Sequence, residues 1–425
     1  MLLEPGGSAP QPIDAAPMLI CDLTQSWSPS GGGGVGTYMA AKRDYVLAHT
    51  PHTLLQIVPG PEDKVVVDGR HIWAEVGADP VRNSPNYRFI LRTGVVRALL
   101  AKYQPAIVES LCPWVLPWTA IHHRRAFRKT ALVAGYSTDF PNAHVFRVAQ
   151  KLFGTTIGRG FQWLSYGYAE VTYREFDWVY TLSEEIRQVL ARRKILRTSV
   201  LPLGVDITQF HPSRRDPAYR AELGLPGNGP LLIYAGRLDN EKRAQTVIDM
   251  FRHLPPALGA ALVLIGDGQR RPDMIADAAG LPIAFPGFIT DRAQIARALA
   301  SSDIYVSGMA DETFGISIVE AQASGLPVVG VASGAMIDRV PPGLGLLGPV
   351  DDAAAMARNV EQLWAAGTRP VGDAAYRHAQ QFSWDRTFEQ LFSDIYPRAL
   401  AHAALRARTG RWAADRVAAA ALAAG

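Results

Sequence analysis

The stretch Glu312-Thr313-Phe314-Gly315-Ile316-Ser317-Ile318-Val319-Glu320 decides the fold, because it connects a short apolar run to a helical pattern. The apolar run is Ile304–Ser307, and Gly325 followed by Leu326-Pro327 ends the helical pattern. A buried strand followed by a loop and a helix is the repeating unit of a parallel α/β sheet. The helix should begin at Phe314-Gly315-Ile316, where free backbone N–H groups and the helix dipole form an anion site.

Two glutamates accompany this helix start. Glu312 lies just before the predicted helix, and Glu320 lies inside it, just over one turn past Ile316. We therefore expect one carboxylate at the mouth of the anion site and the other deeper along the helix. A carboxylate that accepts from two vicinal hydroxyls is a natural clamp for a ribose or a hexose. Taken alone, the pair is also explained by two surface charges.

Short apolar runs alternate with helical stretches along almost the whole chain, which predicts parallel sheets covered by helices. The runs fall into two series, and 425 residues suit two domains of about 200 residues each. The seam lies near Gly204-Val205-Asp206. The expected strands are Met18–Leu23, Thr53–Val58, Ala106–Ser110, Ala131–Tyr136, Trp178–Leu182 and Ser199–Leu203, then Leu231–Ala235, Ala261–Ile265, Ile304–Ser307 and Pro327–Val331.

The predicted organisation is a disordered leader over residues 1–17, a first domain over 18–203 and a second domain over 204–382. The last segment opens with a helix from Trp384, for which Ser383 is the N-cap. Beyond Pro397 the chain is rich in Ala and Arg. This composition favours a terminal helix that frays, with a helix lying on a membrane as the alternative.

The net charge of +4 is unevenly distributed, since residues 1–205 contain 22 Lys and Arg against 16 Asp and Glu, and the remainder 21 against 23. A basic first half suits peripheral contact with an anionic membrane or an anionic acceptor, and ordinary solvated surface explains the same excess. The N-terminus lacks the pattern of a secretory signal, and the chain has only two cysteines. We expect a cytoplasmic protein, with the inner face of the cytoplasmic membrane as the alternative, and no nucleic-acid partner.

A second motif, Gly236-Arg237-Leu238-Asp239-Asn240-Glu241-Lys242-Arg243, follows the predicted strand Leu231–Ala235. It should open a helix over Glu241–Leu254, with Asp239 or Asn240 as the N-cap. Arg237 and Lys242 would then flank a helix start, which suits a diphosphate. A capped helix with surface cations is the simpler explanation.

Two further motifs belong to the first domain. The run Gly31-Gly32-Gly33-Gly34-Val35-Gly36-Thr37 follows the first predicted strand and suits either a phosphate-wrapping loop or a flexible connection. The stretch Tyr136-Ser137-Thr138-Asp139-Phe140-Pro141 lies at the carboxyl end of a predicted strand, where open α/β sheets bind ligands. Asp139 would accept from a hydroxyl or offset a developing positive charge, and an Asx turn before Pro141 is the alternative.

Two aromatic features and one missing motif complete the pattern. Phe288 and Ile289 follow Pro286-Gly287 and suit either a nucleobase contact or the core. Trp114, Leu116, Trp118 and Ile121 precede a basic cluster that extends to Lys129, which suits either a membrane interface or a core helix with a solvated end. The sequence contains no Asp-x-Asp pair for a diphosphate-bound metal, so we predict chemistry that needs neither a metal nor another cofactor.

As a set, these motifs resemble the retaining glycosyltransferases of the GT-B fold, in the group called family 4. The segments Gly204-Val205-Asp206…Phe210, Gly236-Arg237…Lys242, Gly266-Asp267-Gly268 and Glu312…Glu320 have the family's order and spacing. The match extends from about Met18 to Tyr396. The stretch around Tyr136–Pro141 is similar to that of members that glycosylate lipids, such as sulfolipid synthases and mannosyl- or glucosyl-diacylglycerol synthases.

The resemblance implies an α/β protein of two Rossmann-like domains whose parallel sheets face a central cleft. The first domain would bind the acceptor and be completed by helices within 383–425, and the second would bind the nucleotide sugar. The implied contacts are Arg237, Lys242, Gly33, Gly34, Gly315 and Ile316 for the donor diphosphate, Glu312, Thr313, Phe314 and Gly315 for the donor sugar, and Glu320 for the ribose.

The sequence departs from the family at Ser137, where many members carry a His near the reacting carbon. We assign Ser137, Asp139 and Glu312 as candidate catalytic residues. The expected reaction moves a hexose with retention from a UDP- or GDP-sugar to a hydroxyl of a membrane lipid or glycan precursor, and the leaving phosphate takes the acceptor proton. A nucleotide-sugar hydrolase or epimerase, or an inactive nucleotide-sugar-binding protein, is the alternative.

Overall fold

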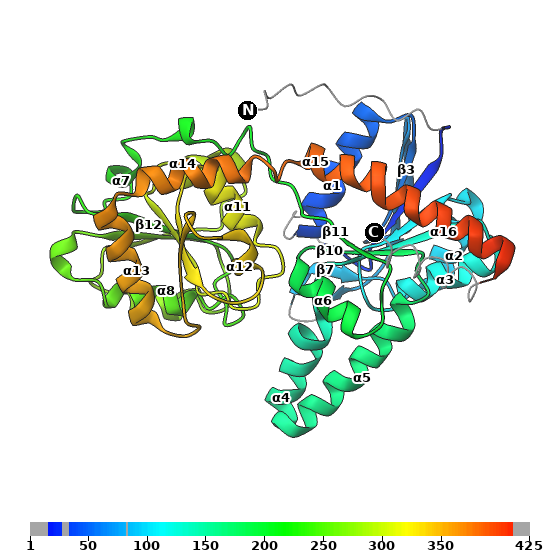
Figure 1. Cartoon of the computed structure of the whole chain (residues 1–425), viewed down its shortest axis with the longest axis horizontal. Coiled ribbons are helices and arrows are strands. Elements are labelled where there is room, and N and C mark those ends of the chain that lie inside the picture. The colour runs from blue at the N-terminus through cyan, green and yellow to red at the C-terminus, as the bar shows by residue number, and fades with distance from the viewer. Residues whose placement is uncertain (1–15, 28–33, 82–83, 411–425) are drawn as a thin grey trace, which may run out of the picture. The chain divides into compact units, whose positions relative to one another are not determined.

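The computed structural model describes residues 16–27, 34–81 and 84–410, and the chain divides into two compact α/β units (Figure 1). The first unit combines Met1–Pro202 with Asp385–Gly425, and the second is Leu203–Trp384. The seams expected at 203/204 and 382/383 lie within two residues of these boundaries. The leader expected over residues 1–17 lies outside the described residues, except for Ala16 and Pro17.

The first unit is built on an eight-stranded sheet with the order β11-β10-β9-β8-β1-β3-β5-β4. Neighbouring strands are parallel except β4 and β5, which form an antiparallel hairpin at one edge. A small antiparallel sheet has the order β2-β7-β6. The strands are β1 (Leu19–Leu23), β2 (Ser26–Trp27), β3 (Thr53–Gly60), β4 (Lys64–Asp68), β5 (His71–Gly77), β6 (Pro80–Val81), β7 (Ser84–Phe89), β8 (Ile107–Ser110), β9 (Ala131–Tyr136), β10 (Trp178–Thr181) and β11 (Thr198–Val200).

Helices connect these strands because a parallel pair needs a crossover between its ends. The last helices of the chain follow the second unit in sequence but belong to the first unit. The helices are α1 (Gly34–His49), α2 (Thr93–Tyr103), α3 (Leu116–Ala126), α4 (Arg147–Phe153), α5 (Thr155–Tyr173), α6 (Glu184–Arg192), α15 (Trp384–Gln390) and α16 (Tyr396–Thr409), with π-helical segments at Pro141–Phe146 and Leu391–Ile395.

The second unit has a six-stranded parallel sheet with the order β14-β13-β12-β15-β16-β17. Its strands are β12 (Leu231–Ala235), β13 (Ala261–Ile265), β14 (Ile283–Gly287), β15 (Ile304–Val306), β16 (Val328–Val331) and β17 (Gly345–Gly348). Its helices are α7 (Tyr219–Glu222), α8 (Ala244–Arg252), α9 (Arg271–Asp277), α10 (Arg292–Ala300), α11 (Ile316–Ala323), α12 (Ala335–Arg339), α13 (Ala353–Ala366) and α14 (Thr368–Ala379), with 3-10 turns at Pro212–Arg214 and Pro256–Leu258.

The predicted membrane-interface alternative for residues 114–129 is wrong. Leu116 and Ile121 are fully buried on α3, and Trp114 and Trp118 pack against the same hydrophobic core. Arg124, from the basic cluster, is also buried and pairs with Glu175. The segment is therefore a core helix. Among the described residues, no helix is long and apolar enough to cross a membrane.

A buried charge cluster lies within the sheet of the first unit. The ammonium group of Lys42 on α1 contacts the carboxylates of Asp22 on β1 and Glu109 on β8, and all three side chains are fully buried. Glu109 also accepts hydrogen bonds from the hydroxyls of Tyr38, Tyr180 and Tyr396. Burial alone would raise the pKa of Glu109, but Lys42 and these hydroxyls outweigh it and hold the pKa below its ordinary value.

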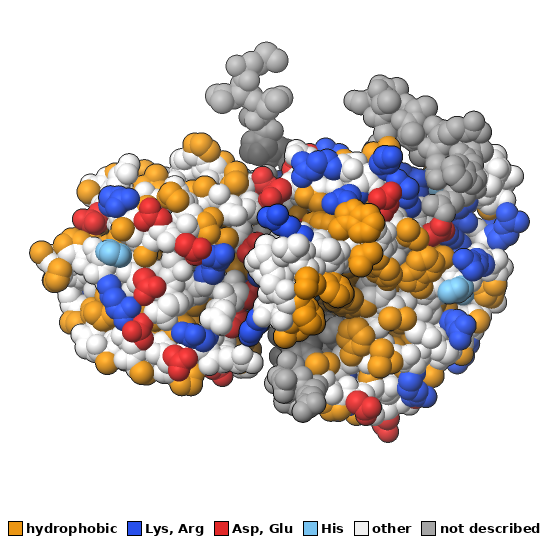
Figure 2. All heavy atoms as spheres, turned by 90° about the horizontal axis from the view of Figure 1, so that it is seen from below, with side chains coloured by type: hydrophobic (Ala, Val, Ile, Leu, Met, Phe, Trp, Pro, Cys, Tyr) orange, Lys and Arg blue, Asp and Glu red, His pale blue; other side chains and the backbone are white. Residues whose placement is uncertain are grey.

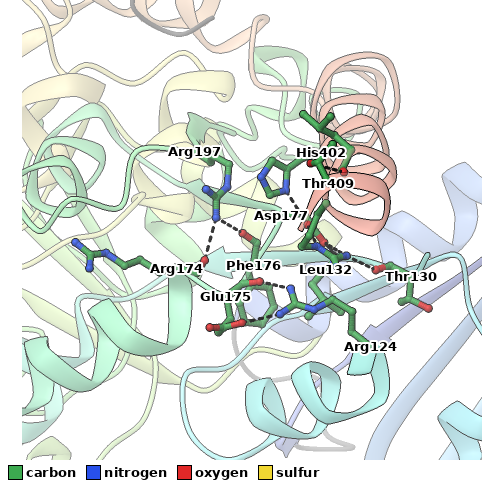
Figure 3. A network of polar contacts seen from close by, with 12 residues as sticks. Arg124, Thr130, Leu132, Arg174, Glu175, Phe176, Asp177, Arg197, His402 and Thr409 are labelled. Atoms are coloured by element: carbon green, nitrogen blue, oxygen red, sulfur yellow. Dashed lines mark hydrogen bonds and ion pairs between the residues drawn. The ribbon is translucent and has the colours of Figure 1, made fainter. Parts of the chain in front are cut away.

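The C-terminal helix is held by a second buried carboxylate (Figure 3). Asp177 Oδ1 accepts from His402 Nδ1 at 2.8 Å and from Arg406 Nε at 2.9 Å, while its Oδ2 accepts from the Leu132 N–H at 2.9 Å. Ala399 and Ala403 of the same helix are fully buried. As far as Thr409, α16 is therefore a docked helix, which corrects both sequence-based alternatives, a frayed helix and a membrane-bound one.

The pairing of Asp177 predicts a pH-dependent stability. Burial alone would raise the pKa of Asp177, but His402 and Arg406 outweigh it and hold the pKa below its ordinary value. Such a carboxylate stabilises the folded state above the unfolded pKa, and the contribution is lost as the pH falls through the folded pKa. Because breaking a buried pair costs roughly 3–5 kcal/mol, we expect Asp177→Asn to lower the melting temperature by about 10 °C at pH 7.

The difference in melting temperature between the parent and Asp177→Asn should become smaller as the pH falls below about 3.9, the ordinary pKa of an Asp. Melting curves of the parent, Asp177→Asn and the exposed-site control Asp44→Asn between pH 7 and pH 3 measure it. A deficit of equal size at both ends of this range would show that the charge of Asp177 does not stabilise the helix.

Candidate functional site

The strand order of the second unit reverses between β12 and β15, since β13 and β14 lie on one side of this pair and β16 and β17 on the other. In open α/β sheets, ligands bind at the carboxyl ends of the strands at such a reversal. The loop after β12 carries Arg237 and Lys242, and the loop after β15 carries Glu312. The structure joins the two motifs, because Lys242 Nζ lies 3.2 Å from Glu312 Oε2.

The N-terminus of α11 has the predicted form. Gly315 precedes Ile316, the first helical residue, and its φ of 83° is a left-handed conformation that favours glycine. Glu312 Oε1 accepts from the backbone N–H groups of Thr313 and Gly315 at 3.2 Å each. The carboxylate of Glu312 thus joins the backbone amides of the loop to the ammonium group of Lys242. Phe314 is only 2% exposed, so it contributes its backbone and its packing rather than an accessible ring.

Three residues that the sequence did not single out support this loop. The backbone N–H of Ala335 donates to the carbonyl oxygen of Glu312 at 2.8 Å, and Gly334 lies against the same carbonyl. Arg339 donates from Nε to the Phe314 carbonyl at 3.2 Å, and its guanidinium lies 4.6 Å from the centre of the Phe314 ring. Burial lowers the pKa of Arg339 to about 10, which still leaves it charged at neutral pH.

Glu320, the predicted ribose contact, is almost completely buried on α11. Its carboxylate pairs with Arg292, at the start of α10, and the Arg292 guanidinium also lies 4.8 Å from the centre of the Phe210 ring. Burial raises the pKa of Glu320, and Arg292 opposes that shift. Arg292 was not predicted, because it follows a different strand and only the folded sheet brings it to Glu320.

The loop after β12 differs in detail from the prediction. The helix α8 begins at Ala244 rather than Glu241, and Asp239 instead caps the preceding turn by accepting from the Lys242 N–H at 2.9 Å. Arg237 is 61% exposed and contacts Asp239 at 2.5 Å and Glu241 at 2.9 Å. Lys242 thus points toward Glu312, whereas Arg237 contacts acidic groups of its own loop.

Phe288 and Ile289, the candidate nucleobase contacts, follow β14 at the edge of the sheet. Phe288 is 63% exposed and Ile289 is half-buried, so neither belongs to the closed core. Two strands, β13 and then β12, separate β14 from β15 and the Glu312 loop. Their role therefore stays a prediction.

The first unit has its own reversal of strand order, between β1 and β8. A cavity of about 220 Å³ lies there, at the carboxyl ends of β1, β8 and β9. Its wall includes the candidate Ser137 and Trp114, which the sequence had placed in a core helix or a membrane interface. It also includes His144, which the sequence did not single out. Gly34 is the first residue of α1, and Gly33 lies outside the described residues. Other lining residues are Thr24, Ser26, Val35, Leu111, Cys112, Pro113, Gly135, Tyr136, Thr138, Phe140 and Tyr173.

Asp139 does not line this cavity. Its two carboxylate oxygens accept from the hydroxyls of Tyr136 at 2.9 Å and Tyr166 at 2.7 Å, so both already have strong donors. Burial raises the pKa of Asp139, and the two hydroxyls oppose the shift. This arrangement ties β9 to α5. The cavity is instead lined by the imidazole of His144, three residues after Pro141 in the sequence, where a His close to the predicted strand end was the available signal.

Known proteins are similar to this chain in sequence and in fold. Residues 215–371 match the family model of the glycosyl transferases group 1. Over 325 residues, the chain is 30% identical to the GDP-mannose-dependent alpha-(1-6)-phosphatidylinositol dimannoside mannosyltransferase of Mycobacterium tuberculosis, covering 72% of this chain and 84% of that relative. The chain belongs to the group 1 glycosyltransferases. The family resemblance predicted from the sequence is confirmed, and the protein is a glycosyltransferase that uses a nucleotide sugar.

Solved structures confirm the GT-B fold of this group 1 glycosyltransferase. Sucrose-phosphate synthase from Thermosynechococcus elongatus aligns with a TM-score of 0.70 at 20% identity, covering 90% of this chain and 100% of that one. HepE from Anabaena, solved with UDP and glucose, aligns with a TM-score of 0.65 at 18% identity, covering 89% of this chain and 100% of that one. At these identities the likeness concerns the fold alone.

Gly334 offers a test of how the Glu312 loop is held. Its φ is 57°, and a Cβ there would lie 2.8 Å from the Glu312 carbonyl oxygen. We expect Gly334→Ala to displace Glu312 and to weaken nucleotide-sugar binding about tenfold, which corresponds to about 1.4 kcal/mol. Gly343→Ala is the matched control, since Gly343 also has a positive φ of 94° but has open space around its Cβ position.

Calorimetric titration with GDP- and UDP-sugars measures the difference between the two variants. Equal affinities in Gly334→Ala and Gly343→Ala would mean that the contact with Gly334 does not position Glu312.

Proposed function

We propose that the protein transfers a hexose, with retention of configuration, from a nucleotide-diphosphate sugar to a hydroxyl group of a lipid-linked acceptor, without a metal ion. The observation that carries the proposal is the contact between Lys242 and Glu312 at the N-terminus of α11. It gathers a cation, the N-terminus of a helix and a carboxylate at the reversal of the second sheet, which is the chemistry that a diphosphate joined to a sugar requires.

The donor would be held through its charged and hydroxyl groups. Lys242 and the first amides of α11 would stabilise the charge that develops on the diphosphate as it leaves. Glu312 would accept from the sugar hydroxyls through the oxygen that now faces Lys242. The ribose would approach Glu320, where Arg292 already keeps the buried carboxylate paired.

Arg237 would contribute only after a change of partner. In the structure its guanidinium contacts Asp239 and Glu241, so a bound diphosphate would have to compete with two carboxylates for it. Exposed ion pairs of this kind contribute about 0.2–1 kcal/mol of stability. A doubly charged diphosphate can therefore replace the two carboxylates at a small cost in free energy. We therefore assign Arg237 to diphosphate binding as a supplementary cation beside Lys242.

Retention follows from a transfer on one face of the donor sugar. The acceptor oxygen would form its bond to the anomeric carbon on the face from which the phosphate oxygen departs, and that phosphate oxygen would take the hydroxyl proton. Such a step needs no separate general base. This suits a cavity in which Ser137 replaces a His and in which Asp139 already accepts from two tyrosine hydroxyls.

The donor and acceptor classes rest on the relatives. The mycobacterial relative is named for GDP-mannose and for a phosphatidylinositol dimannoside, and HepE was solved with UDP and glucose. A hexose on GDP or UDP is therefore the proposed donor class. The cavity is lined by both an aromatic side chain, Trp114, and a hydroxyl, Ser137, which suits the sugar or cyclitol end of a lipid-linked acceptor.

Lys242 and Glu312 provide the direct test of the donor site. We expect Lys242→Ala and Glu312→Ala each to reduce the transfer rate by about 10²–10³, because each removes one electrostatic contact to the reacting groups. Lys64→Ala, which removes an exposed cation on the edge strand β4, is the matched control and should transfer at the parental rate. Transfer is measured as release of the nucleoside diphosphate in the presence of an acceptor preparation.

Parental transfer by both site variants would show that this site is not the donor site. Donor consumption that does not depend on the acceptor would favour the hydrolase alternative. Binding of the nucleotide sugar without any turnover would favour the inactive binding protein, which the engaged state of Asp139 also suits.

The mechanism has a separate test. We expect the transfer rate to be unchanged in the presence of EDTA, since Lys242 and the α11 amides supply the positive charge. We also expect proton NMR of the first-formed product to show the anomeric configuration of the donor. Loss of activity in EDTA that added Mg²⁺ or Mn²⁺ restores would contradict metal independence, and an inverted product would contradict the same-face transfer.

A further inference from the structure

The helices α4 and α5 form a hairpin with an unusually apolar outer surface. In Figure 1 the hairpin projects from the sheet of the first unit, with the α4–α5 connection at its tip. Eight of the eighteen exposed large apolar side chains of the described residues lie on these two helices, and each is between 45% and 69% exposed. They are Val148, Leu152 and Phe153 on α4, and Ile157, Phe161, Trp163, Leu164 and Val171 on α5.

The surface around the hairpin is rich in apolar side chains. Figure 2 views the molecule from the side toward which the hairpin projects, and it shows apolar side chains concentrated over this region. Single exposed apolar residues are ordinary, but a contiguous apolar surface marks a contact site. Because the hairpin is a pair of regular helices, the patch belongs to an ordered element.

The hairpin does not need these side chains for its own attachment. The opposite face of α5 joins the unit through Ala169 and Tyr173, which are buried in the core, and through Tyr166, which donates to Asp139. At the tip, the rings of Phe153 and Phe161 stack with their centres 6.2 Å apart. The outward side chains are therefore available for a partner outside the unit.

The charges around the patch identify the kind of partner. From Arg147 to Tyr173, α4 and α5 contain three basic residues, Arg147, Lys151 and Arg159, and one acidic residue, Glu170, which pairs with Arg174. Lys151 and Arg159 are exposed among the apolar side chains of the hairpin. Aromatic and aliphatic side chains interleaved with cations are typical of segments that bind the interface of an anionic membrane. A second copy of this surface would instead place cations opposite cations.

We propose that the α4–α5 hairpin docks on a lipid surface that carries anionic headgroups, with the tip around Phe153 inserted into the interface. The hairpin is continuous with the π-helical segment Pro141–Phe146, which contributes His144 to the cavity of the first unit. The docked hairpin therefore connects the lipid surface to the cavity. The docking stands by itself, and only the delivery of a lipid-linked acceptor to that cavity rests on the proposed function.

Vesicle flotation of the full chain tests the docking without any substrate. The probes are phosphatidylcholine vesicles and vesicles with about 30% phosphatidylglycerol. We expect the parent to bind the anionic vesicles, and Phe153→Ser combined with Trp163→Ser to reduce the partition coefficient at least tenfold. The matched control combines Val67→Ser with Leu196→Ser, which removes apolar side chains of similar exposure elsewhere in the first unit and should leave binding unchanged.

A second pair of variants tests the contribution of the basic side chains to vesicle binding. Lys151→Gln combined with Arg159→Gln should reduce binding to anionic vesicles by roughly fivefold for each charge removed, and added salt should reproduce the loss in the parent. Lys64→Gln combined with Arg97→Gln is the charge-matched control, because both side chains are exposed elsewhere in the first unit. All variants should keep the parental rise in melting temperature with GDP or UDP, since their changes lie outside the donor site.

Three results would overturn the proposal. The first is equal vesicle binding by the parent and by the hairpin variants, and the second is no binding of the parent to anionic vesicles. The third is a parental dimer in analytical ultracentrifugation that Phe153→Ser with Trp163→Ser dissociates, because the patch would then belong to a second copy of the chain. A parent that binds vesicles but shows no melting shift with GDP or UDP would contradict the proposed function and leave the docking intact.

Discussion

In a buried parallel sheet, polar residues can lie at the carboxyl end of a strand without entering the core. This constraint determines where the polar sites lie in both units. The central strands of both sheets are largely apolar and buried on both faces, so most charged side chains near them lie in the loops that follow the strands. Where the strand order reverses, two such loops diverge to opposite faces of the sheet and leave space between them. The Lys242–Glu312 pair occupies that space in the second unit, and the cavity beside Ser137 occupies it in the first.

The first unit also breaks this pattern, since Asp22 and Glu109 lie within strands rather than after them. Burying a carboxylate without a partner would cost several kcal/mol, and Lys42 together with three tyrosine hydroxyls offsets that cost. Replacing the whole cluster with apolar residues should destabilise the fold less than replacing one partner. The single replacement leaves a buried charge unpaired. The cluster thus joins α1 to β1 and β8 through contacts that each depend on the others.

Much of the fold follows from local sequence patterns. All ten strands predicted from apolar runs are present, and the α11 helix starts and ends at its glycines as predicted. The β4–β5 hairpin was missed because β4 is exposed along its whole length and has no buried run to detect. The short strands β14 and β17 were missed because glycine and proline, which favour turns, interrupt their sequences.

The site was less predictable than the fold, because its contacts join loops that are distant in sequence. Spacing placed Glu312 and Lys242 at helix starts, but only the strand order brings these two side chains together, and the same holds for Arg292 beside Glu320. The distribution of apolar residues along the sequence also could not show which helices lie in the core and which expose apolar side chains. The segment around Trp114 and the α4–α5 hairpin have similar apolar content, yet the first lies in the core and the second faces outward.

The return of the C-terminal helix has a consequence for synthesis on the ribosome. Asp177 obtains two of its three hydrogen-bond donors from His402 and Arg406, and Glu109 receives one from Tyr396. A nascent chain that has emerged only as far as the end of the second unit therefore lacks the partners of a buried carboxylate. The second unit is continuous in sequence and can close as soon as it emerges, whereas the first must wait for the final helix. The unit that is translated first is thus completed last.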